Sequence, residues 1–190
     1  MGQAPVPAPR RAYDLYTLDT VRTPPLTAGR VHLTPLAETD AAEMAEVLAG
    51  DALYTFIGGS APTLEQLRHR YARQAAGSPD PRQEWHNWII RTTAGGRAVG
   101  YVQATVTENG GRAEIAWVVG LAWQGRGYAA ESARAMVAWL RSRGIVEIVA
   151  HIHPDHTASA AVARRVGLEP TDEFHHGERL WRAPLPPDAA

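Results

Sequence analysis

The 190-residue sequence contains no cysteine, which excludes disulfide bonds, thiolate metal ligands and a cysteine nucleophile. It also lacks a long apolar run. A membrane-spanning helix needs about 20 consecutive apolar residues, and no segment supplies them. The first residues lack the apolar core of a secretory signal, and Val6 breaks the serine or threonine requirement of a myristoylation signal. We therefore expect a cytoplasmic protein.

Charge of one sign is not in excess either. Lysine and arginine number 19 against 20 aspartates and glutamates, and the formal net charge is -1. Such a balance gives no global attraction to nucleic acid or to an anionic membrane, so we expect neither as a partner. The length and the 45% hydrophobic content indicate a soluble globular chain with one core.

Proline and alanine are concentrated at both ends of the chain. We predict flexible tails over residues 1–12 and 184–190, around a single domain at residues 13–183. The domain opens with a strand-like run at 30–36. Asp40 and Glu43 then have the spacing of a capping box for a short helix through Leu48.

A second capping box, formed by Thr63 and Gln66, predicts a helix that ends before Gly77. Three strand-like runs separated by glycine pairs follow, which predicts an antiparallel meander. These runs are "WHNWIIRT" (85–92), "RAVGYVQATVT" (97–107) and "RAEIAWVVG" (112–120).

The second half of the chain alternates helices and strands. Apolar residues at helical spacing predict a helix over 127–143, followed by a buried strand at 145–152 and a shorter helix from Thr157 to Gly167. A strand, helix, strand order requires a crossover, so we expect the strand at 145–152 to run parallel to 112–120. A hairpin around "HHGE" closes the domain. The predicted fold class is mixed α/β with one central, mostly antiparallel sheet and one parallel strand pair.

The stretch "QGRGYAAES" connects a predicted strand to a predicted helix. Gly125 and Gly127 permit unusual backbone angles, while Tyr128, Ala129 and Ala130 present free N–H groups at the positive end of the helix dipole. These are the ingredients of an anion site. The glycine spacing is that of neither a dinucleotide fingerprint nor a nucleoside triphosphate loop.

The pattern Gln124-x-x-Gly127-x-Ala129 resembles the acyl-coenzyme A pyrophosphate loop, [RQ]-x-x-G-x-[GA], of the GNAT superfamily of N-acetyltransferases. A second motif of that family, N-x-x-[AS] with a later glycine and apolar residue, is similar to His156, Ser159, Gly167 and Leu168. The order of predicted elements also resembles the family from about residue 30 to 183. The segment "LYTFIGGSAPTLEQLRHR" is similar to the RimJ and RimL branch, which acetylates ribosomal proteins.

The resemblance implies that acetyl-CoA donates an acetyl group to a primary amine by direct attack in a ternary complex. It further implies that the parallel strands splay around the acyl-CoA site and that a backbone N–H near Val118 or Val119 stabilises the oxyanion. The cofactor-binding residues that it implies are Val118, Val119, Gln124, Gly125, Arg126, Gly127, Tyr128, Ala129, Ala130, His156 and Ser159. His156 stands where the family usually has asparagine.

The resemblance also suggests catalytic residues. Glu114 is the candidate base, although a water chain could carry the proton and Glu114 could be a solvated strand-end carboxylate. If Glu114 faces the cleft, Ile115 and Trp117 face the other side of the sheet. Many family members use a tyrosine as the acid where this chain has Ala163, so Ser159 is the candidate replacement.

Acceptor loops in this family lie between the first helices, which makes Tyr54 and Phe56 candidate substrate-binding residues, with Trp85 as a third. The RimJ-like resemblance favours a protein N-terminal α-amine, while a lysine, a polyamine or an antibiotic amine is also compatible. A donor with a longer acyl group stays open, as does the choice between monomer and homodimer.

Two other functions are consistent with the sequence. Ala163, in place of the usual acid, would suit a non-catalytic acyl-CoA-binding module. The "HIHPDH" segment brings His151, His153 and His156 close in sequence, which would suit a histidine-ligated metal hydrolase. The leading prediction includes no metal.

Overall fold

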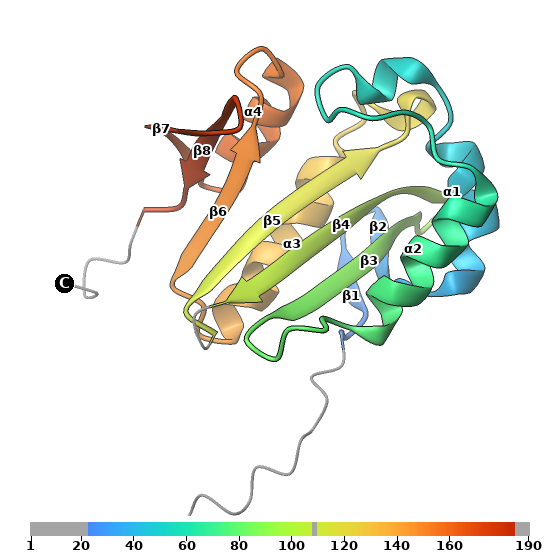
Figure 1. The fold of residues 1–190 in the computed structure, drawn as a ribbon, viewed down its shortest axis with the longest axis horizontal. Helices are drawn as coiled ribbons and strands as arrows, with labels where there is room; N and C mark the ends of the chain where they lie inside the picture. The colour runs from blue at the N-terminus through green and yellow to red at the C-terminus, as the bar shows by residue number, and fades with distance from the viewer. Residues whose placement is uncertain (1–22, 108–109, 185–190) are drawn as a thin grey trace, which may run out of the picture.

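Eight strands form one mixed sheet in the computed structural model, which describes residues 23–107 and 110–184 (Figure 1). The strand order is β1-β2-β3-β4-β5-β6-β8-β7. The strands are β1 (Leu26–Ala28), β2 (Val31–Pro35), β3 (Glu84–Thr92), β4 (Ala98–Thr107), β5 (Arg112–Val119), β6 (Glu147–Ile152), β7 (Glu169–His175) and β8 (Glu178–Arg182). This arrangement confirms the predicted fold class.

Helices cover both faces of the sheet (Figure 1). On one face lie α1 (Ala41–Val47) and α2 (Leu64–Ala76), and on the other lie α3 (Tyr128–Ser142) and α4 (Thr157–Arg165). Short 3-10 turns flank them at η1 (Glu38–Asp40), η2 (Asp51–Tyr54) and η4 (Leu121–Trp123). Each face therefore has its own core. Met136 of α3 packs in one cluster with Trp88 of β3, and Met44 of α1 and Leu67 of α2 pack in the other.

The predicted meander, crossover and closing hairpin are all present, with bounds close to those expected from sequence. One strand was not predicted from the sequence. Strand β1 pairs with β2 through a tight turn at Gly29, which adopts a φ of 52°. The turn expected at 108–111 and the tail predicted at 184–190 lie partly outside the described residues, and the tail predicted at 1–12 lies entirely outside them.

The Thr63 and Gln66 capping box is confirmed, since the Gln66 backbone N–H donates to Thr63 Oγ1 at 3.2 Å and the Thr63 N–H donates to Gln66 Oε1 at 2.8 Å. The box predicted for Asp40 and Glu43 is wrong. Arg91 on β3 donates to both carboxylates at 2.7 Å, and Asp40 Oδ2 also accepts the Ala37 N–H at 2.8 Å, so Asp40 does not cap α1. The Glu43 carboxylate also accepts the Ala98 backbone N–H at 2.8 Å, which ties α1 to β4.

The strands β5 and β6 form the single parallel pair of the described sheet, and they separate soon after they meet. Cα partners run only from Arg112 with Glu147 to Glu114 with Val149. Strand β5 continues to Val119 and remains paired with β4 over its whole length. The edge of β5 that faces β6 is therefore unpaired from Ile115 onward, as the splayed arrangement requires.

Among residues 23–107 and 110–184, none of the helices has the length and apolar character needed to cross a membrane. The cytoplasmic location and the oligomeric state stay predictions.

Gly100 on β4 controls the position of β5 beside this divergence. A Cβ atom at Gly100 would lie 2.1 Å from the Val118 carbonyl oxygen, and backbone cannot move aside as a side chain can. We expect Gly100→Ala to lower the free energy of unfolding by about 3 kcal/mol, measured by urea denaturation. The control is Gly95→Ala, at a φ of 91° with open space around it, which should cost about 1 kcal/mol from backbone strain alone. Equal losses in the two variants would contradict the predicted clash.

Candidate active site

The loop between β5 and α3 has the backbone geometry of an anion site. Gly127 is the N-cap residue of α3 with a φ of 87°, and as a glycine it has no side chain to cap the helix. Gly125 adopts a φ of 73° with nothing within 4 Å of a Cβ position. Gln124 anchors the loop, because its amide Nε2 donates to the Val119 carbonyl at 3.0 Å. The first N–H groups of α3 are thus left available at the positive end of the helix.

A contact that the sequence did not indicate holds this loop from the other side. Arg30, in the β1–β2 turn, makes an ion pair with Glu131 in the first turns of α3. The Arg30 guanidinium also donates to the Arg126 carbonyl at 2.8 Å, and its backbone N–H donates to Glu131 at 3.1 Å. Hydrogen bonding to Glu131 and its charge raise the pKa of Arg30. These partners are far apart in sequence, so no local pattern could reveal them.

A cavity of about 260 Å³, here called the loop cavity, opens between this loop and α4. Nearly all the sequence-predicted cofactor residues line it: Val118, Val119, Gln124, Gly125, Gly127, Tyr128, Ala129, Ala130, His156 and Ser159. The exception is Arg126, whose guanidinium carbon lies 5.1 Å from the centre of the Trp123 ring. The apolar side chains of Trp117, Trp123 and Val162 complete the lining.

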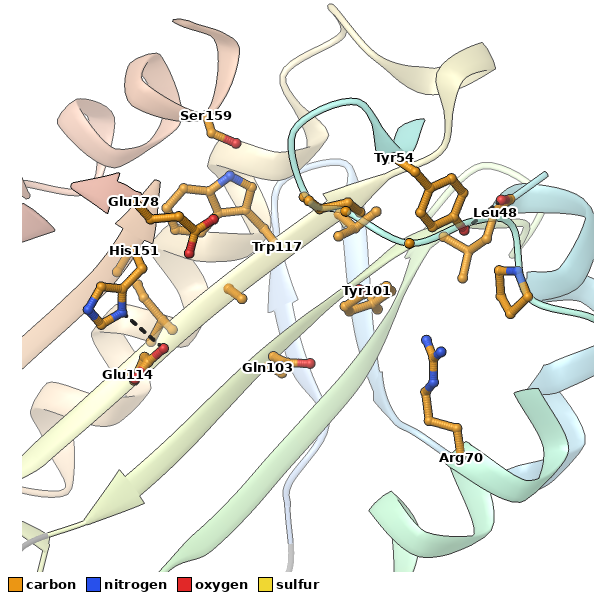
Figure 2. A pocket seen from close by; sticks show the side chains of 18 of the residues that line it. Leu48, Tyr54, Arg70, Tyr101, Gln103, Glu114, Trp117, His151, Ser159 and Glu178 are labelled. Carbon is orange, nitrogen blue, oxygen red and sulfur yellow. Dashed lines mark hydrogen bonds and ion pairs between the residues drawn. The ribbon is translucent and has the colours of Figure 1, made fainter. Parts of the chain in front are cut away.

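A larger cavity of about 890 Å³, here called the sheet cavity, lies over β4 and β5 on the face covered by α2 (Figure 2). Tyr101, Gln103, Glu114 and Ala116 form its floor. Its sides carry ionisable side chains that sequence reasoning did not assign to the acceptor site. These are His69, Arg70 and Arg73 from α2, His151 from β6 and Glu178 from β8.

The two cavities meet at the divergence of β5 and β6. Ile57, Trp117, Val118 and Ser159 line both of them. Trp117 lies on β5 and Ser159 at the start of α4, so they approach the junction from the two sides of the gap (Figure 2). A molecule in the loop cavity and a molecule in the sheet cavity would come together at these residues.

Glu114 faces the sheet cavity and contacts His151 across the last residue pair of β5 and β6. Its Oε1 lies 3.1 Å from His151 Nδ1 (Figure 2). An ionised carboxylate can only accept a hydrogen bond, so His151 Nδ1 is the donor in this contact. Ile115 and Trp117 pack toward the core beneath α3, as strand alternation predicts.

The candidate acceptor residues divide into two groups. Tyr54 lines the sheet cavity, and its hydroxyl donates to the Leu48 carbonyl at 2.9 Å. Partial burial raises the pKa of Tyr54, although the nearby Arg70 opposes this, so the hydroxyl remains a neutral donor. Trp85 lies on β3, with its indole nitrogen 3.3 Å from Gln83, and is not among the residues that line the cavity.

Phe56 makes a contact across the divergence instead of lining either cavity. Its ring stacks on His156 with the ring centres 4.6 Å apart, and it lies 5.5 Å from His153. Burial and the neighbouring His153 lower the pKa of His156, which keeps its imidazole neutral at physiological pH. Phe56 thereby links the segment after α1 to the start of α4.

The histidines of "HIHPDH" do not converge on one point. His151 faces Glu114 and the His175 ring, whereas His153 and His156 lie against Phe56. Within the described ranges 23–107 and 110–184, no group of three or more metal-binding side chains is placed to hold an ion. This geometry gives the hydrolase interpretation no support.

A family model for the acetyltransferase (GNAT) domain matches residues 30–169. The chain belongs to the GNAT family of acetyltransferases. This GNAT protein is accordingly an acetyltransferase whose cosubstrate is acetyl-CoA. A comparison with curated protein sequences found no match.

Solved structures share this fold. A GNAT-family acetyltransferase from Bacillus anthracis is 18% identical with a TM-score of 0.71, and the match covers 84% of this chain and 96% of that one. RimL, a ribosomal α-N-protein acetyltransferase solved with coenzyme A, is 17% identical with a TM-score of 0.70 over 85% and 98% of the two chains. AAC(6')-Ib, solved with paromomycin and acetyl-CoA, is 20% identical with a TM-score of 0.66 over 81% and 92%.

The loop cavity of this GNAT protein suits acetyl-CoA. The uncapped start of α3 would hold the pyrophosphate, since a helix N-terminus favours an anion. The apolar walls from Trp117, Trp123 and Val162 would contact the pantetheine arm. The open space at Gly125 allows close approach to the loop backbone.

We expect Gly127→Glu to weaken coenzyme A binding at least ~10-fold, because it places a carboxylate against the pyrophosphate at a helix N-terminus. Gly144→Glu is the matched control, as Gly144 follows the other end of α3 with a similar φ of 84° and open surroundings. Calorimetric titration with coenzyme A should show wild-type affinity for the control. A similar loss of affinity in both variants would show that the loop does not bind the pyrophosphate.

Proposed function

We propose that the protein transfers acetyl from acetyl-CoA to a primary amine by direct attack in a ternary complex, and that the acceptor is an N-terminal α-amine. The observation that carries this proposal is the meeting of the loop cavity and the sheet cavity at Trp117, Val118 and Ser159. Acetyl-CoA supplies a thioester when bound, and an amine in the sheet cavity would approach it from the opposite side. Both substrates can then be held at once, so no acylated side chain is needed.

Strand alternation distinguishes the two candidate oxyanion donors. The Gly120 N–H donates to Val99 on β4 at 2.9 Å, and backbone N–H groups alternate in direction along a strand. The Val118 N–H therefore points to β4, where Val118 pairs with Tyr101, while the Val119 N–H points into the divergence. The Val119 carbonyl points the same way, because it accepts the hydrogen bond from Gln124. We assign oxyanion stabilisation to the Val119 N–H.

Glu114 and His151 act together in accepting the proton. The Glu114 carboxylate fixes the proton on His151 Nδ1, which leaves Nε2 as the acceptor. Glu114 and Val119 are five residues apart, which is about 17 Å along an extended strand. The proton must therefore pass from the amine to this pair through water in the sheet cavity.

This separation favours an α-amine over a lysine as the acceptor. About 10% of an α-amine with a pKa near 8 is neutral at pH 7, compared with under ~0.1% of a lysine amine. An acceptor that is already partly neutral needs less help from a base that acts through water. An α-amine acceptor agrees with the resemblance to the RimL branch.

Ser159 would protonate the leaving thiolate, and its position supports this role. It lines both cavities at their junction, whereas Ala163 is buried and carries no donor. The Ser159 hydroxyl lies at the start of α4, where the helix dipole favours developing negative charge nearby. Ser159 would hold the proton that the thiolate takes as coenzyme A leaves.

We expect His151→Gln and Glu114→Gln to lower kcat at pH 7 by about 10- to 100-fold, with no change in KM for acetyl-CoA. The deficit should shrink as the pH rises toward 9, because the neutral amine then forms without assistance. A pH–rate profile with an N-terminal peptide amine measures this. A profile parallel to wild type would assign deprotonation to solvent alone.

We expect Ser159→Ala to lower kcat by about 10-fold or more while leaving the calorimetric affinity for coenzyme A within about threefold of wild type. Thr157→Ala, on the same helix turn, is the control and should keep wild-type kcat. Unchanged kcat in Ser159→Ala would remove the serine from the mechanism. Turnover by the wild-type enzyme with any amine would exclude the non-catalytic acyl-CoA-binding alternative.

A further inference from the structure

The charges that line the sheet cavity are separated by sign. Arg70 and Arg73 lie on α2 at one side, and Glu114 and Glu178 lie at the other, beside β6 and β8. In Figure 2 the Arg70 guanidinium points toward Tyr101, and Gln103 separates it from Glu114 and His151. An acceptor in this cavity meets a cationic wall and an anionic wall at the same time.

The two arginines of the cationic wall have no carboxylate partner among the described residues. Other arginines among the described residues do form ion pairs. Arg91 pairs with Asp40 and Glu43, and Arg143 pairs with Glu84. Within residues 23–107 and 110–184, neither Arg70 nor Arg73 makes a hydrogen bond or an ion pair. Their guanidinium donors are therefore available to a ligand.

Arg70 is close enough to the tyrosines of the cavity for its charge to matter. Burial raises the pKa of both Tyr54 and Tyr101, and the charge of Arg70 opposes the rise in each case. Tyr101 is the β4 partner of Val118, at the junction of the two cavities. The cationic wall and the junction of the two cavities therefore lie in one cavity, with Tyr101 close to Arg70 and paired with Val118.

We propose that the acceptor carries a carboxylate near its primary amine, and that Arg70 binds this carboxylate while the amine lies at the junction of the cavities. This inference rests on the proposed function. A guanidinium presents paired donors that match a carboxylate, and the acidic wall of Glu114 and Glu178 attracts the ammonium form of the amine as it enters. Arg73 adds to the positive field from one helical turn away.

The two oppositely charged walls indicate the chemical class. An extended peptide advances about 3.3–3.6 Å per residue, so an acidic side chain at the second or third residue carries its carboxylate away from the terminal amine toward the wall formed by Arg70 and Arg73. The acceptor is thus an acidic N-terminal peptide. Polycationic amines such as polyamines are disfavoured, because Arg70 and Arg73 repel them.

The test is a set of amidated peptides that differ in one group. Ser-Glu-Ala-Ala-amide and Ser-Gln-Ala-Ala-amide have similar shape, but only the first carries a carboxylate. Free glutamate and spermidine complete the set, and coenzyme A release is followed by thiol detection at fixed acetyl-CoA. We expect kcat/KM to be at least ~10-fold higher for the glutamate-containing peptide than for its glutamine analogue.

Variants on α2 identify the residue that is responsible. Arg70→Gln should lower kcat/KM for the acidic peptide to that of its neutral analogue and leave the neutral analogue unchanged. Arg68→Gln, a nearby exposed arginine that does not line the sheet cavity, should change neither value. Arg70→Glu should reverse the preference in favour of Ser-Lys-Ala-Ala-amide.

The outcomes separate this inference from the proposed function. Equal kcat/KM for the acidic and neutral peptides, or a preference that survives Arg70→Gln, would overturn the inference while acetyl transfer stands. Coenzyme A binding by calorimetry without thiol release from any amine would overturn the proposed function. Acetylation of free glutamate in preference to both peptides would support the paired charges and overturn the peptide assignment.

Discussion

The early separation of β5 from β6 is the constraint on which the site depends. Only the residue pairs up to Glu114 and Val149 are formed, so the backbone of β5 beyond that point has one edge without a strand partner. Buried backbone N–H and C=O groups need hydrogen-bond partners. The backbone groups on this edge of β5 point into a gap that ligands can enter. The loop cavity and the sheet cavity open on opposite faces of that gap and share its lining.

Long-range contacts on three sides hold the gap in shape. Arg30 braces the start of α3 through Glu131 and the Arg126 carbonyl, so the anion site is fixed to the first hairpin. The close approach of Gly100 to Val118 sets β5 against β4. On the open side, the stacking of Phe56 on His156 joins the segment after α1 to α4. The donor site and the acceptor site are built from distant parts of the chain, and these contacts keep them in a fixed position relative to each other.

Local patterns predicted most elements because their signals lie within a few residues. Thr63 and Gln66 cap α2 as expected, and the αL conformation at Gly127 starts α3 where the glycine spacing indicated. The Asp40 and Glu43 box failed because Arg91, 51 residues from Asp40, binds both carboxylates, while Asp40 also accepts the Ala37 N–H before the helix. A competing partner at that sequence distance leaves no local signal.

The sequence by itself determined the order of strands and helices, the glycine loop before α3 and the family motif that it carries, because turn chemistry and periodicity act over short distances. It also placed Glu114 and Ser159 as candidates. Only the tertiary structure decided that His151 pairs with Glu114, that Arg126 lies on Trp123, and that Arg70 and Glu178 face one cavity. Those relations depend on where β5 and β6 part and on which helix covers each face, and packing of the whole chain sets both.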